Sequence, residues 1–221
     1  MTVVVKVGGA VADRSAGAVL ELAKTMNVCV VHGAGPQISL EMEQAGIPVE
    51  FVDGLRVTTA AGLDVVRRSF AAVNETLCAA IGARAVPLFG DEIGLEADPV
   101  PELGLVGEAR PSKLPAITEA LDAGLIPVVA PIAEGPLNVN ADSAAAAIAT
   151  GIGADQLLFL TDVDGLILGG EVVDRIDVAQ AEELIASGTL EGGIIPKLGA
   201  AVTAARRGVP AYIGQTEVPS K

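Results

Sequence analysis

Hydrophobic residues change their spacing regularly along the chain. Short β-branched runs, typical of buried strands, alternate with segments in which apolar residues recur every three or four positions, typical of helices. The expected strands are Val3–Val7, Val28–Val31, Ala85–Leu88, Ile126–Ala130, Gln156–Leu160 and Val209–Ile213. The expected helices are Gln37–Ala45, Ala60–Ile81, Ser112–Ala123, Ser143–Thr150, Ala179–Ala186 and Pro196–Arg207. The alternation predicts an α/β fold, a three-layer αβα sandwich around a mainly parallel central sheet.

Glycine and proline mark the joints between these elements. Three helices are expected to end at a glycine, which can adopt positive φ, and a proline that follows within three residues stops the helix and leads into a strand. These joints are Gly46-Ile47-Pro48, Gly124-Leu125-Ile126-Pro127 and Gly208-Val209-Pro210. Small antiparallel hairpins are expected near Leu103–Val106 and Leu166–Val173. We expect one domain, residues 1–221, with a soft division near residues 131–136 into two lobes of one continuous sheet.

Composition narrows the class of protein. Hydrophobic residues make up 51% of the 221 residues and charged residues 19%, which excludes a disordered chain. The 14 basic and 28 acidic residues give a formal charge of −14, so nucleic acids and anionic membranes are not expected as partners. The first residues lack the pattern of a secretory signal, and Cys29 and Cys78 resemble buried thiols of a reducing compartment. We therefore expect a soluble, cytoplasmic protein.

Two expected strands run directly into glycines. Lys6-Val7 leads into the first glycine loop, Gly8–Gly9, and Val31-His32 leads into the second glycine loop, Gly33–Gly35. Each alone could be a tight turn. Two such loops at the carboxyl ends of neighbouring parallel strands favour a ligand site, because exposed backbone N–H groups attract anions there. Neither loop matches a P-loop or a dinucleotide fingerprint.

Two lysines and one aspartate are candidates for the chemistry. Lys6 stands in a Val-rich strand and Lys197 at an apolar helix start, and each position favours an anionic partner. Asp142 follows Asn138 and Asn140, two positions apart in an extended segment, and could also be only the N-cap of the next helix. Thr161-Asp162-Val163-Asp164-Gly165 is either a turn or a nucleotide-contacting loop.

Nucleophilic and metal chemistry find little support. Cys29 and His32 are three residues apart on a strand and so face opposite sides, and a single His with two Cys cannot by themselves build a zinc site. We expect His32 to be a structural hydrogen-bonding residue and no protein-held metal. Two cations, glycine loops and no nucleophile are typical of phosphoryl transfer, which depends on positioning and charge neutralisation.

The chain resembles the amino acid kinase family over nearly its whole length, and most closely the branch that acts on N-acetyl-L-glutamate. The motifs that carry the resemblance agree in order and spacing: Lys6-Val7-Gly8-Gly9, His32-Gly33-Ala34-Gly35-Pro36, Gly54-Leu55-Arg56-Val57-Thr58, Asn138-Val139-Asn140-Ala141-Asp142, Leu160-Thr161-Asp162-Val163 and Gly192-Gly193-Ile194-Ile195-Pro196-Lys197. The resemblance implies ATP-dependent phosphorylation of the side-chain carboxylate of N-acetyl-L-glutamate in arginine biosynthesis, with Mg²⁺ carried by the nucleotide. It also implies an acyl-substrate lobe at residues 1–135 and a nucleotide lobe at residues 136–221.

The resemblance also assigns roles to single residues. Lys6 and Lys197 would neutralise the transferring phosphoryl group and the leaving ADP, and Asp142 would hold both ammonium groups through charge-assisted hydrogen bonds. The expected substrate-binding residues are Ala34, Gly35, Arg56, which would pair with the α-carboxylate, and Asn138. The expected nucleotide-binding residues are Gly8, Gly9, Asp162, Gly165 and Leu166.

Some features depart from the family pattern. Ala34 replaces a glycine, which keeps the N–H group but restricts φ, and Asn74-Glu75 stands where the family has Asn-Lys. In the family, an extension before the first strand accompanies hexamers inhibited by arginine, so this sequence predicts an arginine-insensitive homodimer. Two alternatives stay open: a sister kinase for another carboxylate, such as carrier-linked aminoadipate or aspartate, and a catalytically silent regulator that binds nucleotide or amino acid.

Overall fold

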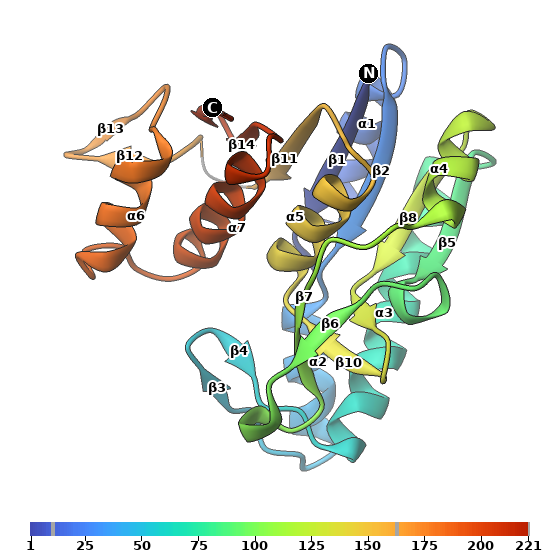
Figure 1. The fold of residues 1–221 in the computed structure, drawn as a ribbon. Helices are drawn as coiled ribbons and strands as arrows, with labels where there is room; N and C mark the ends of the chain where they lie inside the picture. Colours follow the sequence, from blue (N-terminus) through green and yellow to red (C-terminus); the bar gives the residue numbers. More distant parts are fainter. Residues whose placement is uncertain (10–11, 162–163, 221) are drawn as a thin grey trace.

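The computed structural model describes residues 1–9, 12–161 and 164–220. Its largest unit is a seven-stranded sheet in the order β15-β14-β11-β1-β2-β8-β5, parallel except for β15 (Figure 1). The strands of this sheet are β1 (Thr2–Val7), β2 (Asn27–His32), β5 (Ala85–Phe89), β8 (Ile126–Ala130), β11 (Gln156–Leu160), β14 (Ala211–Ile213) and β15 (Thr216–Val218). The mainly parallel sheet confirms the predicted α/β class, although β15 was not predicted.

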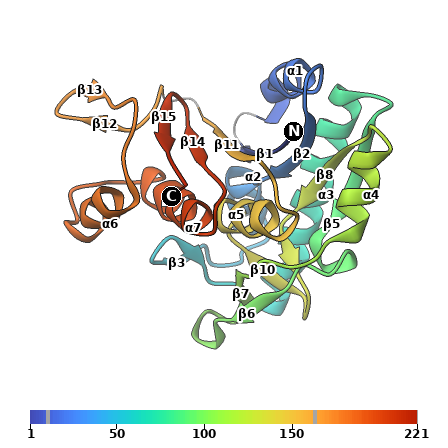
Figure 2. The same ribbon diagram turned by 45° about the horizontal axis from the view of Figure 1, so that its top comes forward.

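Seven helices are described, and they cover both faces of the sheet. They are α1 (Ala12–Leu22), α2 (Gly35–Gln44), α3 (Ala60–Ile81), α4 (Pro115–Asp122), α5 (Ala141–Gly151), α6 (Val178–Ala186) and α7 (Ile194–Arg206). Figure 2 shows α1 and α5 on opposite faces of β1 and β2. Helix α3 has the predicted bounds, α4 begins three residues later than predicted, at a proline suited to the first helical turn, and α1 was not predicted.

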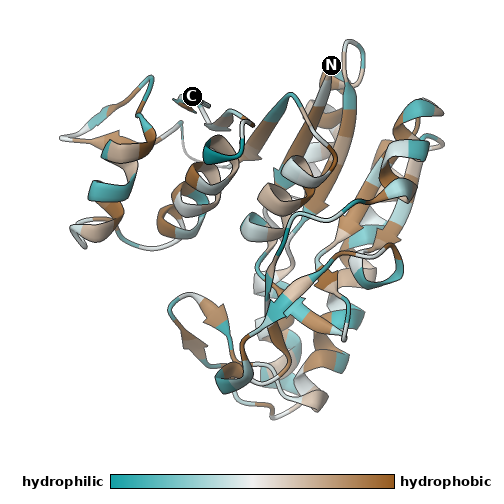
Figure 3. Cartoon of the chain, viewed as in Figure 1, coloured by the Kyte–Doolittle hydropathy of each residue, from teal (hydrophilic) through white to brown (hydrophobic). Residues whose placement is uncertain are grey.

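Two hydrophobic clusters, one on each face, follow from the period of two in the strands. Val3, Val5 and Val7 pack with α1, α2 and α3, whereas Val4 packs with α4, α5 and α7. The inner strands are largely hydrophobic (Figure 3). The same alternation turns Lys6 toward the face that carries α5, and turns His32 toward the face that carries α3.

Smaller sheets complete the fold. One has the order β6-β7-β10-β9, and two hairpins are formed by β3 with β4 and by β12 with β13. The strands are β3 (Phe51–Val52), β4 (Leu55–Arg56), β6 (Ala97–Pro99), β7 (Val106–Ala109), β9 (Ile132–Ala133), β10 (Leu137–Val139), β12 (Ile167–Leu168) and β13 (Glu171–Val172); short 3₁₀ turns η2 (Gly90–Glu92) and η3 (Pro101–Leu103) lie among them. Antiparallel pairing of β6 with β7 and of β12 with β13 confirms both predicted hairpins.

The predicted glycine joints are confirmed in their conformation. Gly46, Gly124 and Gly208 have φ of 68°, 73° and 91°. Gly124 leads into β8 and Gly208 into β14, but the segment after Gly46 is an irregular loop rather than a strand. Within the described ranges, no helix combines the length and the apolar character needed to cross a bilayer.

Candidate active site

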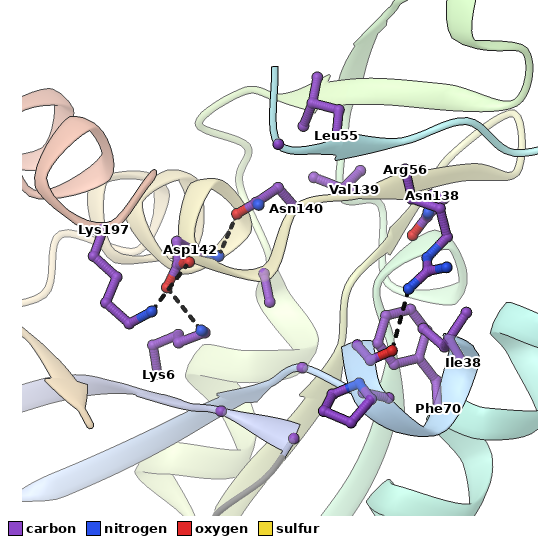
Figure 4. Close-up of a pocket in the computed structure, with 18 of the residues that line it drawn as sticks. Lys6, Ile38, Leu55, Arg56, Phe70, Asn138, Val139, Asn140, Asp142 and Lys197 are labelled. Atoms are coloured by element: carbon purple, nitrogen blue, oxygen red, sulfur yellow. Dashed lines mark hydrogen bonds and ion pairs between the residues drawn. The ribbon is translucent and has the colours of Figure 1, made fainter. Parts of the chain in front are cut away.

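One cavity collects most of the predicted site residues. It has a volume of about 360 Å³ and lies at the carboxyl ends of β1, β2 and β11, beside the first turns of α2, α5 and α7 (Figure 4). Ligands of parallel α/β sheets bind at this edge. Nine predicted residues line the cavity: Lys6, Gly8, Gly9, Ala34, Gly35, Arg56, Asn138, Asp142 and Lys197.

Lys6, Asp142 and Lys197 form what we call the lysine end of the cavity. Lys6 Nζ lies 2.8 Å from Asp142 Oδ1, and Lys197 Nζ lies 3.9 Å from Asp142 Oδ2. Figure 4 shows both lysine side chains pointing at this carboxylate. Lys197 Nζ also donates a hydrogen bond of 3.1 Å to the Gly193 carbonyl. Residues from β1, α5 and α7 therefore converge on one point.

Burial sets the electrostatics of this end. The side chains of Lys6 and Asp142 are each only 7% exposed. Burial lowers the pKa of Lys6, the charge of Lys197 lowers it further, and Asp142 acts against both. The Lys6–Asp142 contact of 2.8 Å is a close ion pair within hydrogen-bond distance, whereas the Lys197–Asp142 contact of 3.9 Å is longer than a hydrogen bond. An anion placed between the two ammonium groups would favour their charged forms.

Asp142 is free for this role because another residue caps its helix. Asn140 is the N-cap of α5, and its side-chain oxygen accepts hydrogen bonds from the Asp142 and Ser143 N–H groups at 2.8 Å and 3.3 Å. The alternative in which Asp142 is the N-cap is therefore wrong. Asn140 also turns to the helix instead of acting together with Asn138.

Arg56 and Asn138 form the arginine end of the cavity. Arg56 Nη2 donates to the Gly35 carbonyl at 3.1 Å and to Ser39 Oγ at 2.8 Å, and the guanidinium lies 4.6 Å from the centre of the Phe51 ring. Burial lowers the pKa of Arg56. Among the described residues no carboxylate forms an ion pair with it, which is unusual for a 7% exposed arginine.

Thr58 connects the two residues of the arginine end. Its hydroxyl donates to the Arg56 carbonyl at 2.9 Å and accepts a hydrogen bond of 3.0 Å from Asn138 Nδ2. Thr58 is fully buried, and its backbone pairs with Leu103 and Leu105. The Gly-Leu-Arg-Val-Thr motif therefore orients Asn138 as well as supplying Arg56.

The second glycine loop connects the two ends. Ala34 has φ −143°, a conformation open to residues with a Cβ, so the replacement of the family's glycine imposes no positive φ here. Helix α2 begins at Gly35, and the first N–H groups of a helix have no partners within it. These groups can receive a carboxylate or a phosphate.

His32, just before this loop, is buried and lies within hydrogen-bond distance of Asn74, which fits the predicted structural role at a strand end. Asn74 Nδ2 lies 3.2 Å from His32 Nε2 and donates to the Val128 carbonyl at 2.9 Å, and the Phe70 ring contacts the imidazole edge-on. Burial lowers the pKa of His32 to about 4, so the ring is neutral at pH 7. It supports the loop from the α3 side.

Two predicted nucleotide residues lie elsewhere, and one is not described. The Gly165 backbone packs against Thr216 and Val172, where a Cβ would come within 2.6 Å of Thr216 Oγ1. The Leu166 N–H donates to Thr216 Oγ1 at 2.8 Å, and its side chain is buried. Neither residue lines the cavity, because the segment is packed on the β14–β15 hairpin. Asp162 lies outside the described residues.

Sequence reasoning did not single out several residues that support the site. They are Gln37, Ser39, Phe51 and Thr58. Gln37 and Thr58 stand inside or beside quoted motifs, so proximity was an available signal. Phe51 pairs with Arg56 across the β3–β4 hairpin, and the Asp53-Gly54 turn between them was an available local signal. Ser39 is 17 residues from Arg56 in sequence, and no local pattern connects the two.

The donor set does not suit a metal held by the protein. No group of three or more His, Cys, Asp or Glu residues that could hold a metal occurs in the described part of the chain. Asp142 lines the cavity, but its carboxylate is already engaged by two lysines.

Comparison with curated proteins gives close relatives. An acetylglutamate kinase of Rubrobacter xylanophilus is 43% identical over 224 residues, which cover 96% of this chain and 88% of the relative. An acetylglutamate kinase of Chloroflexus aggregans is 40% identical over 198 residues, which cover 83% of this chain and 78% of the relative. The similarity therefore extends over most of both proteins.

Comparison with solved structures agrees on the fold. The structure of smu.665 from Streptococcus mutans superposes with a TM-score of 0.89 at 28% identity, covering 100% of this chain and 99% of that one. Carbamate kinase from Giardia lamblia bound to AMP-PNP superposes with a TM-score of 0.77 at 15% identity, covering 100% and 98%. The model of the amino acid kinase family matches residues 1–215, and the chain belongs to that family.

Proposed function

We propose that the protein transfers the γ-phosphoryl group of ATP to the side-chain carboxylate of N-acetyl-L-glutamate, giving N-acetyl-L-glutamyl 5-phosphate in arginine biosynthesis. The observation that carries the proposal is the division of one cavity into two charged ends. Lys6 and Lys197 converge at one end, and Arg56 without an acidic partner lies at the other. The relatives at about 40% identity share this activity in their names.

The lysine end fits the charge that moves in the reaction. A carboxylate oxygen attacks the γ-phosphorus, the bond to the β-phosphate oxygen breaks, and ADP leaves with the electron pair. Lys6 and Lys197 stabilise the phosphoryl group and the leaving oxygen, and Asp142 keeps the two ammonium groups in position. The attacking carboxylate is already ionised at neutral pH, so no general base is needed and Asp142 is an organiser.

The arginine end fits the acceptor. The Arg56 guanidinium pairs with the α-carboxylate through its remaining N–H groups, and the hydrogen bonds from Nη2 to Gly35 and Ser39 fix its orientation beforehand. The Ala34 and Gly35 N–H groups hold the reacting carboxylate, and Asn138 contacts the amide region. Most of this end belongs to the proposed acyl-substrate lobe, residues 1–135, whereas Asp142 and Lys197 belong to the proposed nucleotide lobe, residues 136–221.

Mg²⁺ would be bound by the phosphates of ATP, since the protein offers no carboxylate cluster for it in the described residues. When bound, it supplies charge neutralisation on the β- and γ-phosphates. In the proposal Gly8 and Gly9 contact the phosphates. The loop with Gly165 and Leu166, which is packed on the β14–β15 hairpin outside this cavity, contacts ATP away from the phosphates together with Asp162. Because Mg²⁺ reaches the site bound to ATP in this proposal, we expect the rate to follow the concentration of the MgATP complex.

We further propose a cytoplasmic homodimer. Cys29 and Cys78 are free thiols, which suits a reducing compartment. Strand β5 forms an open edge of the main sheet beside the long helix α3, and a second copy of the chain would cover that edge. Light scattering and assays with added arginine check this part, and a monomer, a hexamer or inhibition by arginine contradicts it.

A substrate panel tests the function. ATP and Mg²⁺ are combined with N-acetylglutamate, glutamate, N-acetylaspartate or aspartate, ADP release is followed by a coupled assay, and hydroxylamine traps any acyl phosphate as a hydroxamate. We expect hydroxamate with N-acetylglutamate alone. Turnover with another carboxylate favours a sister kinase, and ATP binding without turnover favours a regulator.

A further inference from the structure

The two glycine loops touch each other more closely than side chains would permit. A Cβ on Gly9 would lie 2.9 Å from Ala34 Cα and 2.9 Å from the Gly33 carbonyl oxygen. Real Cβ atoms essentially never approach other atoms within 3.0 Å. The packing of the second glycine loop therefore requires glycine at position 9, independently of any ligand that approaches this residue.

Gln37 lies beside this contact, and its side chain reaches from α2 to the first glycine loop. Its side chain comes from the first turn of α2, directly after the second glycine loop, and Gln37 Nε2 donates a hydrogen bond of 2.9 Å to the Gly9 carbonyl. A Cβ on Gly9 would also come within 2.8 Å of Gln37 Oε1. The Gln37 amide thus connects the start of α2, beside the second glycine loop, to the backbone of the first glycine loop, 28 residues earlier.

The amide has little freedom to do anything else. Gln37 Oε1 is buried and has no hydrogen-bond partner in the described structure. The donation from Nε2 to Gly9 fixes which way the amide faces, because the reverse orientation would place Oε1 against the Gly9 carbonyl oxygen. A buried amide with one unmet acceptor costs free energy, so the hydrogen bond to Gly9 is the interaction that favours this position of the side chain.

We infer that Gln37 is a positioning residue that fixes the separation between the first and second glycine loops. The inference rests on the proposed function. In that reaction the first glycine loop holds the phosphoryl group and the second holds the attacking carboxylate. In-line transfer depends on the distance between these two groups, and a displacement of about 1 Å can cost 100-fold in rate. Gln37 is not among the residues that line the cavity, and its hydrogen bond goes to the Gly9 carbonyl, so it acts through the backbone of the two loops.

The contribution of Gln37 differs in kind from that of the charged residues. The lysines and Arg56 supply charge to the two ends of the cavity, whereas Gln37 is neutral and supplies geometry between them. Its loss is therefore expected to change the reaction step more than the binding of either substrate, because each loop keeps its own N–H groups.

The test uses two substitutions at Gln37 and one matched control. Gln37→Met removes the donor but keeps the length of the side chain, and Gln37→Glu keeps the shape but replaces the donor by a carboxylate. Gln44→Met is the control, since Gln44 is an exposed glutamine at the last residue of the same helix. The kcat, the KM for ATP and the KM for N-acetylglutamate are measured for all three and for the wild type, together with Tm.

We expect both Gln37 variants to lose about 10- to 100-fold in kcat, with each KM within about 3-fold of wild type and Gln44→Met unchanged. A kcat for both Gln37 variants equal to that of Gln44→Met overturns the inference and leaves the proposed function intact. A rise in both KM values in proportion to the loss of kcat also overturns it, because a general loss of the site would explain that result. Absence of activity in the wild type overturns the proposed function and, with it, this inference.

Discussion

The two ends of the cavity keep their cations in opposite ways. At the lysine end, two ammonium groups share the Asp142 carboxylate inside the protein. At the arginine end, Arg56 is buried to about the same extent as Lys6, but its hydrogen bonds go to two neutral oxygens and to Met42 Sδ, and its guanidinium lies over an aromatic ring. The lysine end therefore has its counter-ion within the protein, whereas the counter-ion of the arginine end would be the ligand.

This difference matches what each end binds in the proposed function. During phosphoryl transfer, negative charge shifts toward the leaving β-phosphate oxygen as its bond to the γ-phosphorus breaks, so a permanent counter-ion keeps the lysines charged and in position throughout. The α-carboxylate of the substrate carries the same charge from binding to release, so Arg56 can be paired by the substrate itself. Within the proposed function, burial without an acidic partner therefore suits a substrate-binding arginine, and burial with one suits the reacting end.

The largest effect is expected at the lysine end. Lys197→Ala removes a cation that acts mainly on the transition state, so kcat falls by about 100- to 1,000-fold while both KM values change far less. Steady-state kinetics with ATP and N-acetylglutamate measure this. Lys24→Ala, at an exposed lysine that pairs with Glu21, is the control and keeps the wild-type kcat. An unchanged kcat in Lys197→Ala removes this lysine from the catalytic set.

A smaller effect, in binding, is expected at the arginine end. Arg56→Ala loses charge-assisted hydrogen bonds to the α-carboxylate, which raises the KM for N-acetylglutamate by about 10- to 100-fold. Arg56→Lys keeps the charge without the fork and gives an intermediate KM. The affinity for ATP, measured by calorimetry without the acceptor, stays at the wild-type value. Equal loss of both affinities means that the fold, rather than the arginine end, was damaged.

The loop between the two ends depends on a neutral histidine. The pKa of His32 is about 4 in the folded protein against an ordinary 6.5, so between these values the unfolded chain binds more protons. The free energy of unfolding therefore falls as pH decreases through this window, by about 2 kcal/mol from this group between pH 7 and pH 5.

Urea denaturation at pH 7 and pH 5 measures that change. His32→Gln lacks the titrating group, and the contributions of the many acidic residues are common to both proteins. We expect the wild type to lose about 2 kcal/mol more than His32→Gln. Equal losses would show that His32 is protonated in the folded state at pH 5, or exposed to solvent.

The smallest effect is expected at Phe51, which lies over the Arg56 guanidinium from the β3–β4 hairpin. The ring is 54% exposed, and a cation–π contact at such a site contributes about 0.5–1 kcal/mol. Phe51→Leu therefore raises the KM for N-acetylglutamate by about 2- to 5-fold and leaves kcat unchanged. Val52→Ala, the exposed neighbour on the same strand, serves as the control, and an equal rise in its KM would assign the effect to the hairpin as a whole.

The sequence by itself determined the elements and the side chains that carry charge. Period two in β1 assigns Lys6 and Val4 to the same face, and glycines before proline end helices at Gly46, Gly124 and Gly208. These features are local, because they depend on a few neighbouring residues and on backbone conformation. Helix α1, which was not predicted, is less determined by local sequence. Ser15 and Gly17 weaken its local helical signal, and its folding depends on packing against α3.

Only the tertiary structure decided which of these side chains work together. Asn140 rather than Asp142 caps α5, Gly165 and Leu166 pack on the β14–β15 hairpin rather than into the cavity, and Gln37 reaches Gly9 across the two loops. The cap is a choice between two residues two positions apart, whereas the other two outcomes depend on residues 28 to 50 positions apart that compete for the same hydrogen-bonding groups or the same space. Local pattern contains no information on that competition, because it is resolved when the sheet brings the carboxyl ends of its strands together.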